Sequence, residues 1–474
     1  MTNLTRFYIN GKWVQPHSTD VFPILNPSNE KEIGQIVLGD KTDVDRAVSA
    51  AAAAFDSFSN SSKSERLSLL ANLHEISENR LEDLAQAMTM EMGAPISMSR
   101  DAQAASLMGH IESFRHALET LVESETLPGG DLLLREPIGV CGLITPWNWP
   151  ILQIGLKVIP ALAAGCTCVL KPSEHAPISA SIFAELIDAA GFPAGTFNLV
   201  HGKGEQVGRA LAQHPDIQMI SFTGSTRAGK DVTKNAADDI KRVTLELGGK
   251  SPNVVFADSD LEERIPASVY ECFYNSGQSC DAPTRLIVER SCYGQVVQLA
   301  EQAARSQEVN DPSLEGDHIG PLFDEIQYHR VQGMIQAGID EGATLLVGGL
   351  DRPEGIDTGW YVKPTVFSDV NNTMRIAQQE IFGPVLVIIP FDDEDEAIQI
   401  ANDSPYGLAA YIQTSDSKRA ERVAARLRAG QIHINGSAPS FATPFGGFKQ
   451  SGNGRECGTH GLEEYLELKS ICRN

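Results

Sequence analysis

Cys280 occupies a position from which a thiol could act as a nucleophile. It closes a polar, glycine-containing turn, Gly277-Gln278-Ser279-Cys280, between a helical and a strand-like segment. A thiolate attacks carbonyl carbons readily, but a free cysteine with a pKa of about 8.5 is only slightly ionised at neutral pH and must be activated. Most cysteines in a chain of this length are instead inert, buried side chains, and position alone does not separate these two interpretations.

Two further polar side chains lie in segments suited to assist such a nucleophile. Glu246 stands just before the pair Gly248-Gly249, which allows a ligand to approach closely, so its carboxylate could work as a general base. Asn148 lies within Pro146-Trp147-Asn148-Trp149-Pro150, a stiff segment that could hold an amide donor toward developing negative charge. A charge at the end of a strand and a rigid turn within a core are the structural alternatives.

Three turns that follow strand-like segments have features of phosphate or ribose binding. The turn 202–208 reads GxGxxxG, one residue longer than the dinucleotide fingerprint, and a plain turn is the alternative. The turn 224–230 resembles a P-loop, but Asp231 stands where Ser or Thr would hold Mg²⁺, which argues against nucleoside triphosphate hydrolysis. The helix N-terminus after this turn could still hold a pyrophosphate. Lys171 and Glu174 could bind the two hydroxyls of a ribose.

Strand-like and helical segments alternate along most of the chain and would place these turns at strand ends. The first series has strands at 140–144, 167–170, 197–200 and 219–222 and helices at 151–164, 178–190 and 205–213. The second has strands at 253–256 and 284–288 and helices at 260–275 and 293–306. We also expect helices at 42–60 and 63–91, a hairpin at 7–14, and loops with short elements at 308–372. The alternation predicts an α/β fold of two doubly wound parallel-sheet domains joined near 246–252.

The composition argues against several classes of protein. Of the 474 residues 62 are acidic and 38 are basic, and the net charge of −24 argues against nucleic-acid and anionic-membrane partners. The eight cysteines include no CxxC pair, so no metal site is expected. Prolines and Lys157 interrupt the apolar stretch 140–170, and residues 1–6 lack the apolar part of a signal peptide. We therefore expect a soluble, cytoplasmic protein without membrane spans.

Taken together, these segments resemble the aldehyde dehydrogenase superfamily. The likeness runs from the N-terminal hairpin to Lys469, in the order and with the spacing of the family. The matching blocks are residues 146–150, 171–174, 222–225, 246–249, 277–280, 380–384 and 444–452. The resemblance implies an oxidoreductase that converts an aldehyde to a carboxylic acid with NAD(P)⁺. Because Glu246 is present, we favour the hydrolytic, non-acylating type.

The resemblance also implies a role for each candidate catalytic residue. Cys280 attacks the aldehyde carbon, and hydride transfer to the nicotinamide leaves a thioester. The Asn148 amide and the Cys280 backbone N–H form the oxyanion hole, in which one donor contributes about 3–4 kcal/mol. Glu246 activates the water that hydrolyses the thioester. Lys157 and Glu456 are expected to carry the proton onward.

A dinucleotide site is implied in the same way. The predicted cofactor-binding residues are Ile144, Thr145, Pro146, Trp147, Lys171, Ser173, Glu174, Gly204, Gly208, Phe222, Gly224, Ser225, Leu247, Gly248, Glu380 and Phe382. Lys171 and Glu174 would meet the adenosine ribose, and Glu380 and Phe382 the nicotinamide ribose. Because the carboxylate of Glu174 would repel a 2′-phosphate, NAD is favoured and NADP is the alternative.

The substrate tunnel is implied to be largely apolar and aromatic. Its predicted residues are Trp149, Gln153, Leu156, Phe441 and Phe445. These segments show no arginine pair to hold a carboxylate, and no acidic-aromatic cage for a cation stands out in the sequence. We therefore expect medium-chain, aromatic or terpenoid aldehydes.

The predicted domain organisation has three parts. Residues 1–117 and 138–248 form a Rossmann-like cofactor domain, and residues 249–450 form the catalytic cysteine domain. Residues 118–137 and 451–474 form a small β element that bridges subunits, because relatives use such an element for oligomerisation. A homodimer or homotetramer is expected.

Three other functions are left open by the sequence. A coenzyme A-acylating dehydrogenase would turn over only with added coenzyme A. A non-catalytic relative would keep the cofactor-binding fold as a structural or binding protein, although Cys280, Glu246 and Asn148 are all present. A thiol esterase would cleave esters without a cofactor, and the dinucleotide-type turns would then have no purpose.

Overall fold

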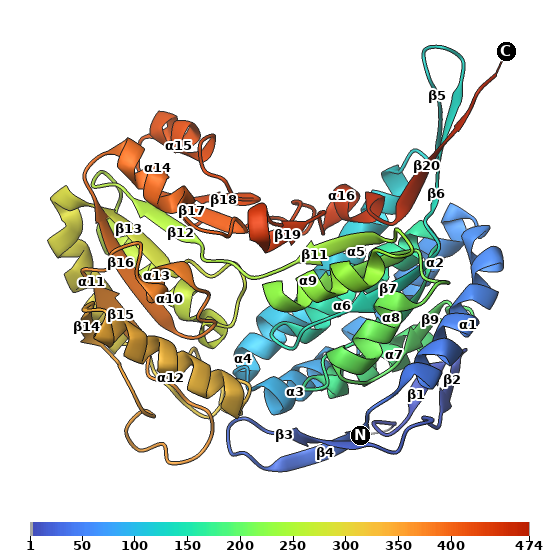
Figure 1. Ribbon diagram of the computed structural model, residues 1–474, viewed down its shortest axis with the longest axis horizontal. Coiled ribbons are helices and arrows are strands. Elements are labelled where there is room, and N and C mark those ends of the chain that lie inside the picture. The colour runs from blue at the N-terminus through green and yellow to red at the C-terminus, as the bar shows by residue number, and fades with distance from the viewer. Residues whose placement is uncertain (1–2, 474) are drawn as a thin grey trace.

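The computed structural model describes residues 3–473. Its largest sheet has eight strands (Figure 1). Its order is β19-β11-β10-β7-β8-β9-β1-β2, with β11 to β9 parallel and the strands at both edges antiparallel. The strands are β1 (Phe7–Ile9), β2 (Lys12–Val14), β7 (Val140–Ile144), β8 (Thr167–Lys171), β9 (Phe197–Leu199), β10 (Met219–Thr223), β11 (Arg242–Glu246) and β19 (Gly452–Asn453). The central strands β7, β8 and β10 are buried along their whole length, as expected for a parallel sheet covered on both faces.

Helices pack on both faces of this sheet. One core contains residues of α2, α3, α5, α6 and α7, and the core on the opposite face contains residues of α1, α8 and α9. The helices are α1 (Lys41–Ser59), α2 (Lys63–Glu78), α3 (Leu81–Met92), α4 (Ile96–Met98), η1 (Ser99–Ala104), α5 (Ala105–Thr120), α6 (Pro150–Ala164), α7 (Pro177–Ala189), η2 (Gly204–Gly208), α8 (Arg209–Gln213) and α9 (Thr226–Ala236). Helix α6, which follows the Asn148 loop, starts with Pro150 in its first turn, where proline is favoured.

A second sheet of seven strands has the order β14-β15-β16-β13-β12-β17-β18 and is parallel except for β14. The strands are β12 (Pro252–Val255), β13 (Arg285–Glu289), β14 (Thr344–Val347), β15 (Thr365–Ser368), β16 (Val385–Phe391), β17 (Ala409–Gln413) and β18 (Gln431–Ile434). The helices are α10 (Leu261–Phe273), η3 (Tyr274–Gly277), η4 (Arg290–Cys292), α11 (Tyr293–Arg305), α12 (Glu325–Asp340), α13 (Arg375–Gln378), α14 (Glu394–Asn402) and α15 (Ser417–Ala424). Leu286 faces the core under α10 and α11, and its neighbour Ile287 faces the core under α14 and α15, so both faces are covered.

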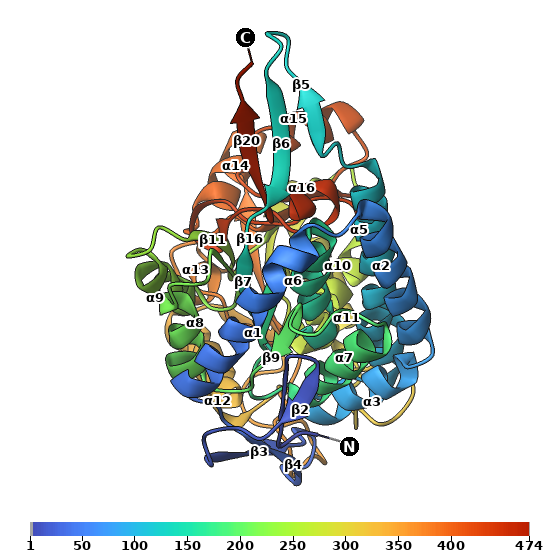
Figure 2. The same cartoon turned by 90° about the vertical axis from the view of Figure 1, so that its right-hand side faces the viewer.

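A three-stranded antiparallel sheet projects away from the two large sheets (Figures 1 and 2). Its order is β20-β6-β5, and β20 pairs with β6 from Leu466 opposite Pro137 to Ile471 opposite Leu132. The remaining elements are β3 (Val21–Leu25), β4 (Glu32–Val37), β5 (Ser124–Thr126), β6 (Leu132–Pro137), β20 (Leu466–Ile471), η5 (Lys449–Ser451) and α16 (Gly458–Glu463). β6 and β20, which lie in the segments 118–137 and 451–474 of the expected small β element, thus pair in one sheet.

The predicted fold class is confirmed: an α/β protein with two large, mainly parallel sheets and a small β element. Residues 1, 2 and 474, which belong to predicted domain segments, lie outside the described residues. Within residues 3–473, no helix has the length and apolar character needed to cross a membrane.

The expectation for residues 308–372 is wrong in one respect. This region contains the 16-residue helix α12, which is capped by Asp324 and buries Tyr328, Val331 and Ile335. Segments rich in Asp, Gly and Pro lie on both sides of this helix, and they made the helical spacing of its apolar residues hard to recognise in the sequence. The segment 63–91 also divides, because α2 ends at Glu78 and α3 begins at Leu81.

Candidate active site

Cys280 lies between η3 and β13, after a turn with an unusual backbone. Asn275, Ser276 and Gly277 have φ angles of 54°, 56° and 70°, all in the left-handed region. For residues other than glycine such angles cost up to about 1–3 kcal/mol each and persist only where the surroundings fix them. A side chain at Gly277 would collide with the backbone of Gly383, so glycine is required there. The turn therefore holds Cys280, which is half-buried, in a defined place.

Amide hydrogen bonds tie this turn to the loop that carries Asn148. The buried Asn148 side chain donates from Nδ2 to the Gln278 carbonyl over 2.9 Å. Asn275 Nδ2 donates to the Asn148 carbonyl over 2.9 Å, and Trp149 Nε1 donates to the Ser279 hydroxyl over 2.9 Å. The amide predicted to stabilise negative charge comes from a loop of the first sheet and is fixed beside the nucleophile turn of the second.

Glu246 is the last residue of β11, and its side chain is almost completely buried. Within residues 3–473 neither of its carboxylate oxygens has a hydrogen-bond partner. Burial, and then repulsion by Glu456, raises the pKa of Glu246 well above its ordinary value, while Lys157 and Arg455 oppose the rise. Lys157 and Glu456 form a buried ion pair. The structure thus brings the three predicted acid–base residues together, and a perturbed carboxylate in such a place suits proton transfer.

The electrostatic surroundings of Cys280 disfavour negative charge on its sulfur. Burial raises the pKa of the Cys280 thiol well above its ordinary value, and the carboxylates of Asp281, Glu246 and Glu380 raise it further. The thiol therefore ionises only when a proton acceptor or a positive charge is brought to it. Six of the other cysteines are buried and Cys472 is exposed.

The candidate residues gather at the carboxyl ends of four adjacent parallel strands. Ile144 ends β7, Lys171 ends β8, Thr223 ends β10 and Glu246 ends β11, and these strands lie in the order β11-β10-β7-β8. In open α/β sheets ligands bind in the crevice at this edge. The sequence therefore placed the turns correctly because each follows a strand of the same sheet.

A cavity of about 200 Å³ opens at this edge. The predicted residues that line it are Pro146, Trp147, Asn148, Gly224, Ser225, Glu246, Leu247, Gly248, Cys280, Glu380 and Phe382. The lining residues that sequence reasoning missed are Thr223, Phe323, Asp324, Ile326, Gln327 and Arg330. Phe323 stacks on Trp147 with ring centroids 3.5 Å apart. Most of the missed residues belong to the start of α12, and the Asp324 cap before a periodic segment was the signal that could have found them.

Half of the predicted cofactor residues lie outside this cavity, at strand ends and in the turns that follow. They are Ile144, Thr145, Lys171, Ser173, Glu174, Gly204, Gly208 and Phe222. Lys171 Nζ and Glu174 Oε2 form an ion pair at 3.0 Å. Although burial opposes ionisation, the Lys171 ammonium lowers the pKa of Glu174, so this turn presents a carboxylate and an ammonium side by side.

Four side chains near the predicted tunnel segments are among those that pack, partly buried, against the core formed by α2, α3, α5, α6 and α7. Two of them, Trp149 and Phe445, belong to the predicted tunnel, and two, Leu152 and Tyr274, do not. The ring centroids of Trp149 and Tyr274 lie 6.1 Å apart. Leu152 is three positions after Trp149, and helical spacing could have indicated it.

The remaining predicted tunnel residues occupy different surroundings. Gln153 and Leu156 are buried on α6, and within the described chain Gln153 Oε1 has no hydrogen-bond partner. Phe441 is 47 % exposed, and its ring centroid lies 5.0 Å from that of His110 on α5. The hydroxyl of Ser113 donates to the Phe441 carbonyl over 3.0 Å.

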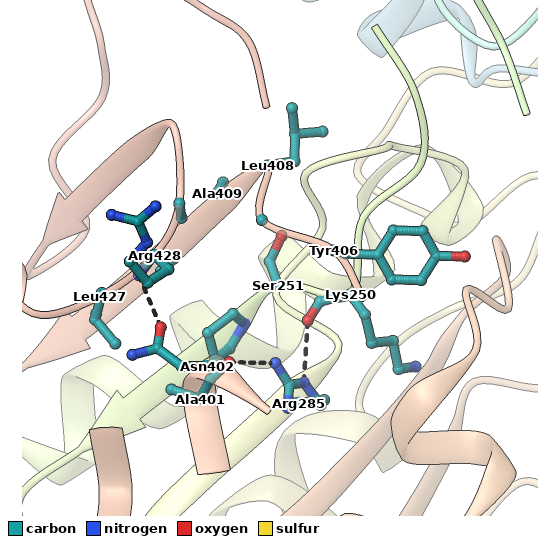
Figure 3. A pocket seen from close by; sticks show the side chains of 14 residues that line it. Lys250, Ser251, Arg285, Ala401, Asn402, Tyr406, Leu408, Ala409, Leu427 and Arg428 are labelled. Atoms are coloured by element: carbon teal, nitrogen blue, oxygen red, sulfur yellow. Dashed lines mark hydrogen bonds between the residues drawn. The ribbon is translucent and has the colours of Figure 1, made fainter. Parts of the chain in front are cut away.

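A second, very small pocket of about 10 Å³ lies beside the segment that links Glu246 to the second sheet (Figure 3). The buried Arg285 donates from Nε to the Lys250 carbonyl over 3.0 Å and from its terminal nitrogens to the carbonyls of Ile400 and Ala401 at the end of α14. Burial lowers the pKa of Lys250 to about 7. These bonds anchor the backbone after the Gly248-Gly249 pair, and the space is too small for a substrate.

Within residues 3–473 no group of three or more His, Cys, Asp or Glu side chains is arranged to hold a metal ion. One parallel sheet ends in a crevice of the dinucleotide type, and the other supplies a half-buried cysteine to the same cavity. A buried carboxylate lies at the same place. This combination defines a dehydrogenase that works through a covalent cysteine adduct.

Comparison with known proteins identifies the family. The model described as "Aldehyde dehydrogenase family" matches residues 13–471, and the chain belongs to that family. A 3-succinoylsemialdehyde-pyridine dehydrogenase of a Pseudomonas species is 50 % identical over 472 residues, which is 99 % of each chain.

Solved structures of aldehyde dehydrogenases have the same fold as this chain. An aldehyde dehydrogenase of Bartonella henselae is 49 % identical, with 99 % of each chain covered and a TM-score of 0.98. A cysteine-to-alanine variant of aldehyde dehydrogenase C of Pseudomonas syringae, solved with NAD⁺ and octanal, is 51 % identical over 99 % of this chain and 96 % of that one, with a TM-score of 0.98. The predicted family, fold and enzyme class are confirmed: the chain is an aldehyde dehydrogenase.

Proposed function

We propose that this aldehyde dehydrogenase uses NAD⁺ to oxidise aldehydes to carboxylic acids and releases the acid by hydrolysis. The observation that carries the proposal is the carboxylate of Glu246, which is buried and without a hydrogen-bond partner in the described chain, in the cavity that Cys280 also lines. A general base in that position can activate water, so coenzyme A is not needed. The relatives solved with NAD⁺ support the choice of cofactor.

The Cys280 thiol releases its proton to solvent, and the thiolate Sγ attacks the aldehyde carbon, so that the carbonyl oxygen becomes the negatively charged oxygen of a thiohemiacetal. The Cys280 N–H and the Asn148 amide donate to that oxygen. The Gln278 carbonyl uses one of the two Asn148 amide hydrogens, and the other is available to the substrate. Loss of hydride leaves a thioester on Cys280. Glu246 then takes a proton from water as the water attacks the thioester. The C–S bond breaks, the carboxylic acid is released and Cys280 leaves as the thiolate, while the proton passes from Glu246 to the carboxylate of Glu456, which is paired with Lys157.

The residues at the strand ends fit a dinucleotide. Ser225 caps the 11-residue helix α9, and the free amides at this N-terminus suit a pyrophosphate. Lys171 and the ionised Glu174 would hold the adenosine ribose, and Glu174 would repel a 2′-phosphate, so NAD⁺ is preferred to NADP⁺. Glu380 and Phe382 would meet the nicotinamide ribose. Bound NAD⁺ would supply the acceptor for the hydride.

We also propose the division of the chain into a cofactor domain (1–117 and 138–248), a catalytic domain (249–450) and an oligomerisation element (118–137 and 451–474). The edge strand β20 supports the last part, because it exposes Leu468 and Ile471. A dimer or tetramer in the cytoplasm is the state we expect. Light scattering of the full chain tests it, and a monomer at assay concentration would contradict it.

For the substrate we propose an aldehyde with an apolar or aromatic body. Trp149, which donates to Ser279 beside Cys280, and Tyr274, whose ring centroid lies 6.1 Å from that of Trp149, support this class. Two relatives also support it: one was solved with octanal, and the other is named a 3-succinoylsemialdehyde-pyridine dehydrogenase.

The test follows NADH formation by the purified full chain with aliphatic, aromatic and terpenoid aldehydes, each with and without coenzyme A. Turnover without coenzyme A supports hydrolysis. Turnover only with coenzyme A would assign the protein to the acylating type, and dinucleotide binding without any aldehyde oxidation would assign it to a non-catalytic role. Cys280→Ser should abolish NADH formation.

A further inference from the structure

A second large cavity, of about 420 Å³, lies behind the cysteine turn. One wall comes from α4 and η1, next to the first sheet, and the other from the end of α10 and the segment 316–319, next to the second. Its volume is typical of small-molecule sites. The residues that give it its chemistry are Asp101, Tyr270, Tyr274, Asn275 and Asp317.

The cavity combines aromatic rings with carboxylates. The ring centroids of Tyr270 and Tyr274 lie 5.5 Å apart, and Tyr270 Oη donates to Asp317 Oδ1 over 2.9 Å. Burial, followed by the negative charges of Asp317 and Asp101, raises the pKa of Tyr274 to about 12. Among the lining residues of the described chain none is a lysine or arginine, and His318 is the side chain there that can take up a positive charge, against the two carboxylates of Asp101 and Asp317. Negative potential over aromatic faces favours a bound cation.

The cavity is next to the nucleophile turn. Asn275, which lines it, is also the residue that donates to the Asn148 carbonyl. From Ser279, beside Cys280, a row of rings leads outward. Trp149 donates to the Ser279 hydroxyl, Tyr274 lies 6.1 Å from Trp149, and Tyr270 follows at 5.5 Å. These contacts form a continuous row of aromatic side chains from the residue next to Cys280 to the lining of the cavity.

We propose that this cavity receives the far end of the aldehyde substrate and selects tails with a positive charge, such as a quaternary or protonated amine, over tails with a carboxylate. The inference rests on the proposed function, because it concerns the substrate of the same Cys280. Asp101 and Asp317 are exposed, so their attraction is screened by solvent. One exposed ion pair or cation–π contact changes affinity by about two- to fivefold, and the combined preference should be about tenfold.

The sequence did not show this site, because its acids and tyrosines come from segments far apart in the chain. Asp101 belongs to η1, Tyr270 to α10, and Asp317 to a loop before α12. Only the contact between the two halves of the molecule brings them to one cavity.

Three aldehydes with the same three-methylene spacer test the proposal: 4-(trimethylammonio)butanal, its neutral isostere 5,5-dimethylhexanal, and 5-oxopentanoate. For each, kcat/KM is measured with NAD⁺ and the full chain at low and high salt. We expect the cationic aldehyde to exceed the neutral one by about tenfold, the anionic one to be poorest, and the differences to shrink as salt is added.

Two variants locate the effect. In the double variant Asp101→Asn/Asp317→Asn the cationic-to-neutral ratio should fall to about one third or less of its original value. Glu421→Gln removes an exposed acid on α15, outside the cavity lining, and should leave the ratio unchanged. A ratio near one in the unaltered protein, or a ratio that survives the double variant, would overturn the inference. If no aldehyde is oxidised at all, the proposed function fails instead, so the two failures are distinguishable.

Discussion

Replacing Glu246 by glutamine removes the proposed base while keeping the size and shape of the side chain. Within residues 3–473 neither carboxylate oxygen accepts a hydrogen bond, so no bond is lost. The glutamine also resembles the protonated acid, the form that burial favours. We therefore expect the free energy of unfolding near pH 4 to change by no more than about 1 kcal/mol.

The sign of the effect on stability follows from the raised pKa. A carboxyl whose pKa is higher in the folded than in the unfolded protein destabilises the fold as it ionises, that is, as pH rises above about 4.3, the unfolded value. The glutamine variant lacks this penalty. Its denaturation midpoint should rise relative to that of the unaltered protein between mildly acidic and neutral pH.

The effect on turnover should be large and confined to one step. A positioned general base contributes about 10²–10⁴-fold to the step it assists. Attack by Cys280 and hydride loss come before water is activated, so the first turnover should still release about one NADH per active subunit. The steady rate should then fall by about 10² or more. Stopped-flow absorbance measures the burst, and intact-mass measurement detects the acyl group that accumulates on the chain.

The pH dependence of the steady rate gives an independent check. The base is active as the carboxylate, so the rate should rise with pH through the raised pKa of Glu246 and be lost below it. The glutamine variant should lose that inflection, and the control Glu421→Gln should keep it. A steady rate within about threefold of the unaltered one would remove Glu246 from its role, because even the weakest general base contributes more. A missing burst would place Glu246 in the attack step.

Three further substitutions test the neighbouring assignments. Asn148→Ala removes an oxyanion donor and should slow the burst by about 10²–10³, and an unchanged burst rate would exclude the role. Lys157→Met removes a cation that opposes the rise in the pKa of Glu246, so the pH profile of the steady rate should move to higher pH, and an unmoved profile would contradict the coupling. Glu174→Gln removes the charge that opposes a 2′-phosphate. It should raise the NADP⁺-to-NAD⁺ ratio of kcat/KM by about tenfold, which corresponds to about 1.4 kcal/mol, whereas an unchanged ratio would show that Glu174 does not set the preference.

Local patterns predicted the part of the fold that positions the site. Val140–Ile144 is a continuous apolar run before a proline-rich turn, and the structure has β7 at those residues. The helix expected at 151–164 is α6, displaced by one residue at its start. The apolar run of the strand, and the apolar spacing and first-turn proline of the helix, are local patterns that span only a few residues. Such patterns can be read from one sequence.

Properties that depend on distant contacts could not be obtained in this way. Lys157 and Glu456 are 299 positions apart, so their ion pair, and with it the environment of Glu246, exists only in the folded chain. Phe323 joins the cofactor cavity by stacking on Trp147 from the other half of the molecule. Tyr274 lies close to Cys280 in sequence, but its place on the substrate side depends on its packing near Trp149.

The raised pKa values of Glu246 and Cys280 have a shared cause. Glu246 is buried and Cys280 half-buried at one cavity, and the negative charge of Glu246 is among the groups that raise the pKa of the thiol. A protonated Glu246 leaves the sulfur easier to ionise, whereas an ionised Glu246 suits the later attack of water, so we expect the ionisation of one group to affect that of the other. Glutamine at position 246 should therefore move the pH profile of Cys280 alkylation by iodoacetamide to lower pH. If the pH profile of alkylation does not move, the charge on Glu246 does not affect ionisation of the Cys280 thiol. The protonation state of Glu246 would then influence the hydrolysis step alone.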